Sequence, residues 1–194
     1  MLARQTARRT VLLALPALLA GCSSAVQSPP LAISARQALQ WRSFVDDQLK
    51  GQIALGEVTG ADAPAVGYLR KTLAWLWGSR TSPDTVGDAL EDQLRALRLL
   101  APLPGTGRYQ LDTQLMALEA EGLLGPSEAQ AQVEYRLREK GEGGRLIYQR
   151  RIRSQAKAGW LDHGFASERQ RLAKEAALRA SLMMLAQDLV ALRV

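Results

Sequence analysis

The chain has 194 residues, of which 47% are hydrophobic and 23% are charged, with a formal net charge of +6 and a pI of about 9.9. This length suits one domain with a buried core, and a single cysteine excludes a disulfide within the chain. Residues 1–21, which are expected to be cleaved, hold three arginines and no acid, so the remaining chain has a net charge of about +3. This small charge argues against nucleic acid as a partner.

Residues 1–21 have the layout of a cleaved export signal. Three arginines precede an apolar run over residues 11–20, which is too short to cross a bilayer as a helix. Two small residues, Ala20 and Gly21, then stand before the single cysteine, Cys22. The alternatives are an ordinary signal peptide with a chance cysteine, or a cysteine buried in the core.

The sequence Leu19-Ala20-Gly21-Cys22 resembles the lipobox of bacterial lipoproteins. The resemblance implies attachment of diacylglycerol to Cys22 through a thioether, cleavage before this residue and acylation of the new amino terminus. Several acyl chains hold a protein firmly on a membrane. In enterobacterial lipoproteins an aspartate after the cysteine favours the inner membrane, so Ser23 implies the periplasmic face of the outer membrane.

The chain after the cysteine divides into a tether and a domain. Residues 22–33 are predicted to be a lipidated, flexible tether, because Ser23 to Pro30 are rich in Ser, Gln and Pro without a period. Residues 34–194 are expected to form one α+β periplasmic domain. Ser34 is a candidate N-cap for a helix over 35–49. A first strand is predicted over 52–58.

Residues 64–80 form an aromatic segment with nearby basic residues. The candidate interface residues in it are Tyr68, Trp75 and Trp77. Aromatic and basic side chains dominate protein interfaces and also lie at bilayer surfaces, so this segment is a candidate contact with either. The alternative is that its tryptophans cover the core.

The second half of the chain predicts a helix, three strands and a final helix. Ser82-Pro83 begins the first helix, whose apolar stripe ends before two prolines. Alternating residues predict strands over 109–118, 129–139 and 145–158, with Ala117 and Leu146 among the core-facing positions. Ser167 and Gln170 fit a capping box at the start of the final helix, which carries leucines at spacings of three and four.

This order predicts an α+β two-layer sandwich, with a mostly antiparallel four-stranded sheet, helices packed on one face and a long C-terminal helix. The stretches "GRYQLDTQLMAL", "VEYRLREKGEGGRLIYQRRIRSQAKAG" and "ERQRLAKEAALRASLMMLAQDLVAL" resemble, at the level of pattern, the strand–turn–strand–helix end of the lipopolysaccharide-assembly lipoproteins of the outer-membrane translocon. The resemblance covers residues 88–193. It implies a part in lipopolysaccharide handling.

A basic strand face is the main candidate binding site. A two-residue period places six cations on the face opposite the core: Arg136, Arg138, Arg145, Arg151, Arg153 and Lys157. All but Arg145 are the candidate ligand-binding residues. Such a face attracts phosphate-bearing ligands, such as lipid A or anionic headgroups, through charge-assisted hydrogen bonds. The alternative is an ordinary solvated face, in which Glu134 dilutes the charge.

The sequence offers little for catalysis. The only histidine, His163, follows Asp162 in the loop "GWLDHG", and no residues cluster at the spacing of metal ligands. We therefore expect no enzyme, no cofactor and no metal. The predicted function is a membrane-anchored binding or assembly module whose partner is an outer-membrane protein or anionic lipid. The alternatives are a periplasmic regulator that binds a partner protein, and an envelope enzyme.

Overall fold

The computed structural model describes residues 29–60 and 83–194, apart from 123 and 142. The elements in these residues are α1 (Ala35–Trp41), the short 3₁₀ helix η2 (Arg42–Phe44), β1 (Ile53–Thr59), α3 (Pro83–Ala96), β2 (Tyr109–Glu121), β3 (Ser127–Glu139), β4 (Leu146–Ala158) and α4 (Ala166–Ala191).

The four strands form one sheet in the order β1-β2-β3-β4. Strands β2, β3 and β4 form an antiparallel meander, whereas β1 runs parallel to β2. A parallel pair needs a crossover connection, and this connection contains α3. The predicted α+β fold is confirmed, with a sheet that is mixed and not purely antiparallel.

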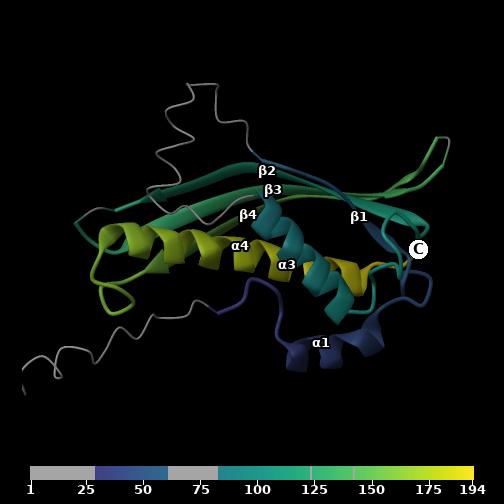
Figure 1. Ribbon diagram of the computed structural model, residues 1–194, viewed down its shortest axis with the longest axis horizontal. Coiled ribbons are helices and arrows are strands. Elements are labelled where there is room, and N and C mark those ends of the chain that lie inside the picture. Colours follow the sequence, from purple (N-terminus) through teal and green to yellow (C-terminus); the bar gives the residue numbers. More distant parts are fainter. Residues whose placement is uncertain (1–28, 61–82, 123, 142) are drawn as a thin grey trace, which may run out of the picture.

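All of the described helices lie on one side of this sheet (Figure 1). Helix α4 packs across β2, β3 and β4, whereas α3 packs on β1 and α1 packs on α3. The predicted apolar stripe is fully buried, at Val86, Leu90 and Leu94 of α3 and at Leu97 directly after the helix. The core therefore lies between the helices and one face of the sheet, as expected for an amphipathic layer on a half-buried sheet.

Polar contacts fix the position of α4 on the sheet. The hydroxyls of Tyr135 and Ser181 lie 3.0 Å apart, both buried. At the edge strand, Tyr148 donates to Asp188 at 2.6 Å and the Arg150 guanidinium contacts the same carboxylate at 2.6 Å. Burial and this carboxylate both raise the pKa of Tyr148, so it stays a protonated donor.

Two helix boundaries differ from the prediction. Ser34 does cap α1, since its hydroxyl accepts from the amide of Gln37 at 3.3 Å, but the helix ends at Trp41 and not at residue 49. The Arg42 side chain there donates to the carbonyl of Ala96 at the end of α3, which fixes the chain where it turns. A tertiary contact thus ends a helix that the apolar period alone would continue.

The predicted capping box of α4 is also wrong. The N-cap is Phe165, without a side-chain hydrogen bond, so Ser167 lies inside the helix. The reason is Arg169, whose guanidinium donates to the carbonyls of His163 and Gly164 and sets the path of the chain into the helix. The four leucines Leu178, Leu182, Leu185 and Leu189 are buried as predicted.

Two register shifts change which face a residue occupies. On β2 the register shifts between Leu115 and Ala117, so Ala117 lies opposite Gln132 on the outer face. On β4 a second shift places Leu146 opposite Arg138, also on the outer face, where it is 48% exposed. Both residues were predicted to face the core. A bulge puts the side chains on its two sides out of phase, so a strict two-residue period assigns one side to the wrong face. The local sequence did not reveal either bulge.

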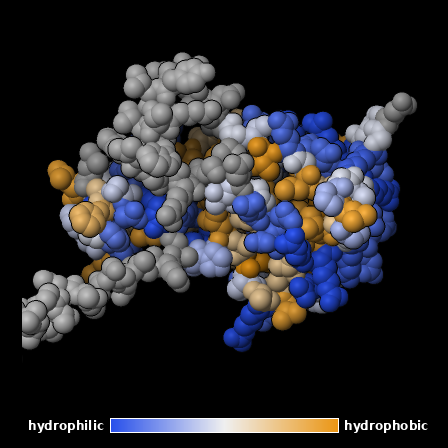
Figure 2. Space-filling view, viewed as in Figure 1, coloured by the Kyte–Doolittle hydropathy of each residue, from blue (hydrophilic) through white to orange (hydrophobic). Residues whose placement is uncertain are grey.

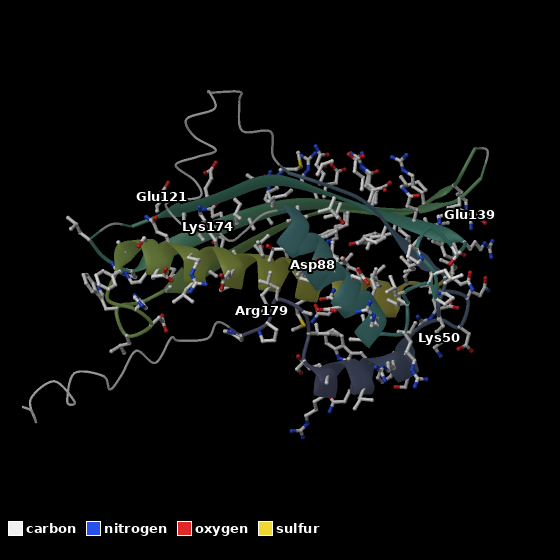
Figure 3. The ribbon with its side chains drawn as sticks, viewed as in Figure 1. Lys50, Asp88, Glu121, Glu139, Lys174 and Arg179 are labelled. Carbon is white, nitrogen blue, oxygen red and sulfur yellow. The ribbon has the colours of Figure 1, made fainter. Side chains whose placement is uncertain are left out.

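The N-terminal part of the described chain is attached to α4. Arg179, about halfway along α4, donates to the carbonyls of Pro29 and Pro30 at 2.6 and 2.9 Å (Figure 3). Ile33 is buried against the core. Within the described residues, no helix combines the length and hydrophobicity required to span a membrane.

Candidate functional site

The outer face of the sheet carries most of the candidate binding residues. The described helices cover only the opposite face, and the outward side chains of the four strands form one polar surface, which we call the outer face. It includes six glutamines at Gln110, Gln114, Gln130, Gln132, Gln149 and Gln155. Its acidic side chains come mainly from β2 and β3 and its basic side chains mainly from β3 and β4.

The structure brings all five candidate ligand-binding cations to this face. On β4, Arg151 lies opposite Glu134, Arg153 lies opposite Gln132, and Lys157 lies opposite Glu128. On β3, Arg136 and Arg138 occupy alternate positions of the same strand. The alternation of the residues between them is also as predicted, because Val133, Tyr135 and Leu137 are fully buried on the other face.

A nearly buried carboxylate holds two of these cations. Glu134 is only 5% exposed, and its oxygens accept from Arg136 at 3.0 Å and lie 3.8 Å from Arg151. The Gln149 amide also donates to it. This amide hydrogen bond and the two guanidinium groups lower the pKa of Glu134, against the opposing effect of burial. Glu134 is therefore an anion at neutral pH and offsets the positive charge around it.

A third cation is also paired, since Lys157 contacts Glu128 at 2.6 Å, with both side chains well exposed. Among the described residues, the side chains of Arg138 and Arg153 have no hydrogen-bond or ion-pair partner. The outer face is thus a balanced arrangement of charges with two uncompensated arginines. Glu134 thus dilutes the positive charge of this face, as in the alternative interpretation of the sequence.

Two adjoining hollows lie on the outer face. One, of about 260 Å³, is lined by Glu57, Thr59, Gln110, Asp112, Thr113, Gln114, Glu134 and Arg136. The other, of about 300 Å³, shares Gln110 and Asp112 with the first and adds Arg138, Glu139 and Lys140 from the hairpin side. Volumes at the lower limit of ligand pockets, with mixed polar linings, suit the side chains of a macromolecular partner better than an enclosed small molecule.

A glycine makes room for this hollow. A Cβ on Gly56 of β1 would lie 2.0 Å from Oδ1 of Asp112 and 2.8 Å from the Gln110 side chain. The same Asp112 oxygen accepts from the Gln110 amide at 2.7 Å and from the backbone amide of Glu57 at 3.3 Å. Asp112 and Gln110 were not among the predicted site residues. Their alternation with core residues was visible, but their contact with β1 depends on parallel pairing.

The histidine loop shows no catalytic arrangement in the residues that the structure describes. Nδ1 of His163 accepts from the amide of Phe165 at 3.2 Å, and the Asp162 carboxylate accepts from the amide of Gly159 at 2.6 Å. Both side chains therefore serve the loop and not each other. Among the described residues, no group of three or more His, Cys, Asp and Glu side chains could hold a metal ion.

The aromatic interface candidates Tyr68, Trp75 and Trp77 lie outside the described residues, as does Cys22. Their predicted roles stay predictions.

Comparison with solved structures supports the fold. Protein XCC0632 of Xanthomonas campestris, from the DUF330 family, has a TM-score of 0.51 and 13% identity over 72% of this chain and 84% of that protein. A candidate lipoprotein from Caulobacter crescentus has a TM-score of 0.45 and 16% identity over 78% of this chain and 93% of that protein. A minor lipoprotein from Acinetobacter baumannii has a TM-score of 0.37 and 11% identity, with coverage of 73% and 92%.

These identities concern the fold alone, and only the first score is high enough to carry even that statement. No protein-family model and no curated protein matches the sequence. The three descriptions do not mention lipopolysaccharide assembly, so that resemblance also stays a prediction.

Proposed function

We propose that the protein is a lipid-anchored, non-catalytic lipoprotein of the bacterial cell envelope, held on the periplasmic face of the outer membrane, which binds a partner protein through its outer face. The anchor rests on the lipobox-like sequence ending at Cys22 and on the outer-membrane preference implied by Ser23. The absence of catalysis is part of the proposal. It is supported by the use of Asp162 and His163 in holding their own loop.

The single observation that carries the binding role is the composition of the outer face. Any set of polar side chains would suffice to solvate a sheet face that no described helix covers. Here it presents alternating glutamines and opposite charges around two hollows that a neighbouring glycine makes possible. Polar interfaces between proteins are formed by such mixed hydrogen-bonding surfaces, with charge complementarity that selects the partner.

Binding of phosphate-bearing lipid is the second candidate function. Arg138 and Arg153 support it, because neither is paired with a carboxylate among the described residues. Lipopolysaccharide handling, implied by the resemblance of residues 88–193, would use these two groups. Glu134 and Glu128 count against it, because three of the five cations are already paired and their partners would repel phosphate.

Site-specific photocrosslinking in intact cells tests the proposal. A benzoylphenylalanine in place of Gln155, an exposed residue of the outer face, should crosslink to one protein of defined mass in the membrane fraction. The matched control replaces Gln187, an exposed glutamine on α4, and should give no such product. Equal products from both positions, or crosslinks to lipopolysaccharide alone from position 155, would contradict a partner protein on the outer face.

A further inference from the structure

Two adjacent loops form one end of the molecule. The turn that joins β2 to β3 and the loop of residues 159–165 that joins β4 to α4 meet there (Figure 1). Their proximity follows from the register, since Ser127 at the start of β3 pairs with Ala158 at the end of β4. In addition, the Gln170 side chain on α4 donates to the carbonyl of Gly122 at 3.5 Å. Side chains from both loops therefore lie at the same end of the molecule.

These loops expose four large apolar side chains, which we call the apolar tip: Leu124, Trp160, Leu161 and Phe165. Leu124 is 94% exposed and Leu161 is fully exposed, whereas Phe165 and Trp160 are 71% and 57% exposed. Apolar atoms project from this end of the molecule (Figure 2). Single exposed apolar residues are ordinary, but a group of four on neighbouring loops indicates a contact with an apolar phase or partner.

The loop that carries three of these side chains is held in place from below. The guanidinium of Arg169, which is 1% exposed, donates to the carbonyls of Gly164 at 2.7 Å and His163 at 3.1 Å. It also lies 4.2 Å from the ring centre of Trp160, an arrangement typical of a cation–π contact. The buried guanidinium and its contact with Trp160 thus hold the loop and its apolar groups in a fixed geometry. The conformational entropy of this loop is therefore lost on folding and not on binding.

The geometry points to the apolar tip as a second membrane contact, which inserts into the interfacial region of the bilayer that holds the lipid anchor. This inference rests on the proposed function, because it assumes acylation at Cys22. Tryptophan, phenylalanine and leucine are the residues that bury their apolar parts at the boundary between headgroups and acyl chains. Two membrane contacts would fix the orientation of the domain on the membrane.

The length of the chain between the anchor and the domain permits this arrangement. The chain reaches α4 at Arg179, which holds Pro29 and Pro30. Arg179 lies about halfway along α4, roughly 20 Å from the first turn of the helix beside the tip at 1.5 Å per residue. The seven residues from Cys22 to Ser28 span at most about 24 Å when extended. The anchor can therefore enter the same membrane surface as the tip.

The charges around the tip predict that insertion does not depend on anionic lipid. The nearest cation of the outer face, Lys157, is paired with Glu128, and the Asp162 carboxylate is occupied by the amide of Gly159. On the first turns of α4 beside the tip, Arg169 is buried under the loop and Arg171 is paired with Glu168 and Glu175, so burial of apolar surface should drive the contact. Salt and headgroup charge should then have little effect, in contrast to phosphate binding at Arg138 and Arg153.

An environment-sensitive fluorophore tests this on the full lipidated protein in phosphatidylcholine vesicles. The probe is attached at Leu161→Cys in the tip, and acylation of Cys22 leaves the introduced thiol as the only reactive one. The matched control is Leu103→Cys, whose leucine is 63% exposed in the segment before β2, at the opposite end of the sheet. We expect a blue shift and quenching by brominated acyl chains at position 161, with neither at position 103.

A companion variant removes the tip itself. Replacing Leu161 and Phe165 together with serine should abolish quenching of a probe at Leu124→Cys. Replacing Phe44 and Leu103, which are exposed apolar residues outside the tip, should not. Solvent-like emission from position 161 on vesicle-bound protein would overturn the inference while leaving the anchor intact. A blue shift that occurs only in native membranes would also overturn it, in favour of a protein partner. Failure of the protein to float with vesicles at all would instead reject acylation.

Discussion

Replacing Glu134 with glutamine separates the balanced outer face from a phosphate-binding one. The substitution keeps the shape of the side chain and removes its charge. It weakens the contacts to Arg136 at 3.0 Å and to Arg151 at 3.8 Å. A hydrogen bond to a charged group contributes about 1.5–3 kcal/mol. The arginine side chains are 36% and 50% exposed, so solvent screens them, and we expect the variant to lose about 1 kcal/mol of unfolding free energy.

The pH dependence gives this prediction a sign. The folded-state pKa of Glu134 is lowered, so its contribution is fully present above the pKa of the unfolded chain, which is about 4.3. The contribution disappears as the pH falls through the folded pKa, because the wild-type side chain then becomes neutral as well. The two proteins should therefore differ at pH 7 and converge in acid.

Urea unfolding at several pH values measures this difference. The control is Glu128→Gln, whose contact with Lys157 is exposed on both sides and should change stability by less than about 0.5 kcal/mol. The variant at Glu134 should also bind anionic vesicles more strongly in low salt, since Arg136 and Arg151 lose their carboxylate. Equal stability of wild type and Glu134→Gln across the pH range would refute the role assigned to this ion pair.

Three further substitutions test the packing. Arg98 has a φ of 61°, a left-handed conformation after the end of α3, so Arg98→Gly should raise the unfolding free energy by about 1 kcal/mol in urea titration, and a decrease would contradict this assignment. Tyr135→Phe should lower the unfolding free energy by about 1–2 kcal/mol in thermal unfolding, because it leaves the Ser181 hydroxyl buried without its partner. Adding Ser181→Ala should restore part of this loss, whereas purely additive effects of the two substitutions would argue against the hydrogen bond. Arg169→Met should lower the unfolding free energy by about 2–4 kcal/mol and speed proteolysis within residues 159–165. An unchanged cleavage rate there would show that the loop does not depend on this guanidinium.

The sequence predicted the structure best where burial of one strand face alone set the alternation of apolar and polar residues. Val133, Tyr135 and Leu137 alternate with polar residues, and the structure buries all three. The stretch around Ala117 is less informative, because Met116, Ala117 and Leu118 are all apolar and show no alternation. A bulge there costs little in burial, so periodicity could not locate it.

Features that depend on contacts between distant segments could not be predicted. The pairing of Glu128 with Lys157 and of Glu134 with Arg151 requires the register of β3 and β4. The apolar tip likewise depends on this register, because only then do Leu124 and the loop after β4 lie at the same end. In the sequence "GWLDHG" the histidine is the residue that a catalytic pattern would use, whereas the structure shows that Trp160 and Leu161 are the exposed apolar residues of this loop.

The mass of the mature N-terminal peptide tests the central claim, lipid anchoring, most directly. The protein is purified from membranes, digested and analysed by mass spectrometry. We predict a peptide that begins at Cys22 and carries a thioether-linked diacylglycerol and an N-acyl chain, and we predict that Cys22→Ala accumulates as an unprocessed precursor without lipid. A mature protein that begins at another residue, or one with an unmodified Cys22, would contradict the lipid anchor and the membrane orientation built on it.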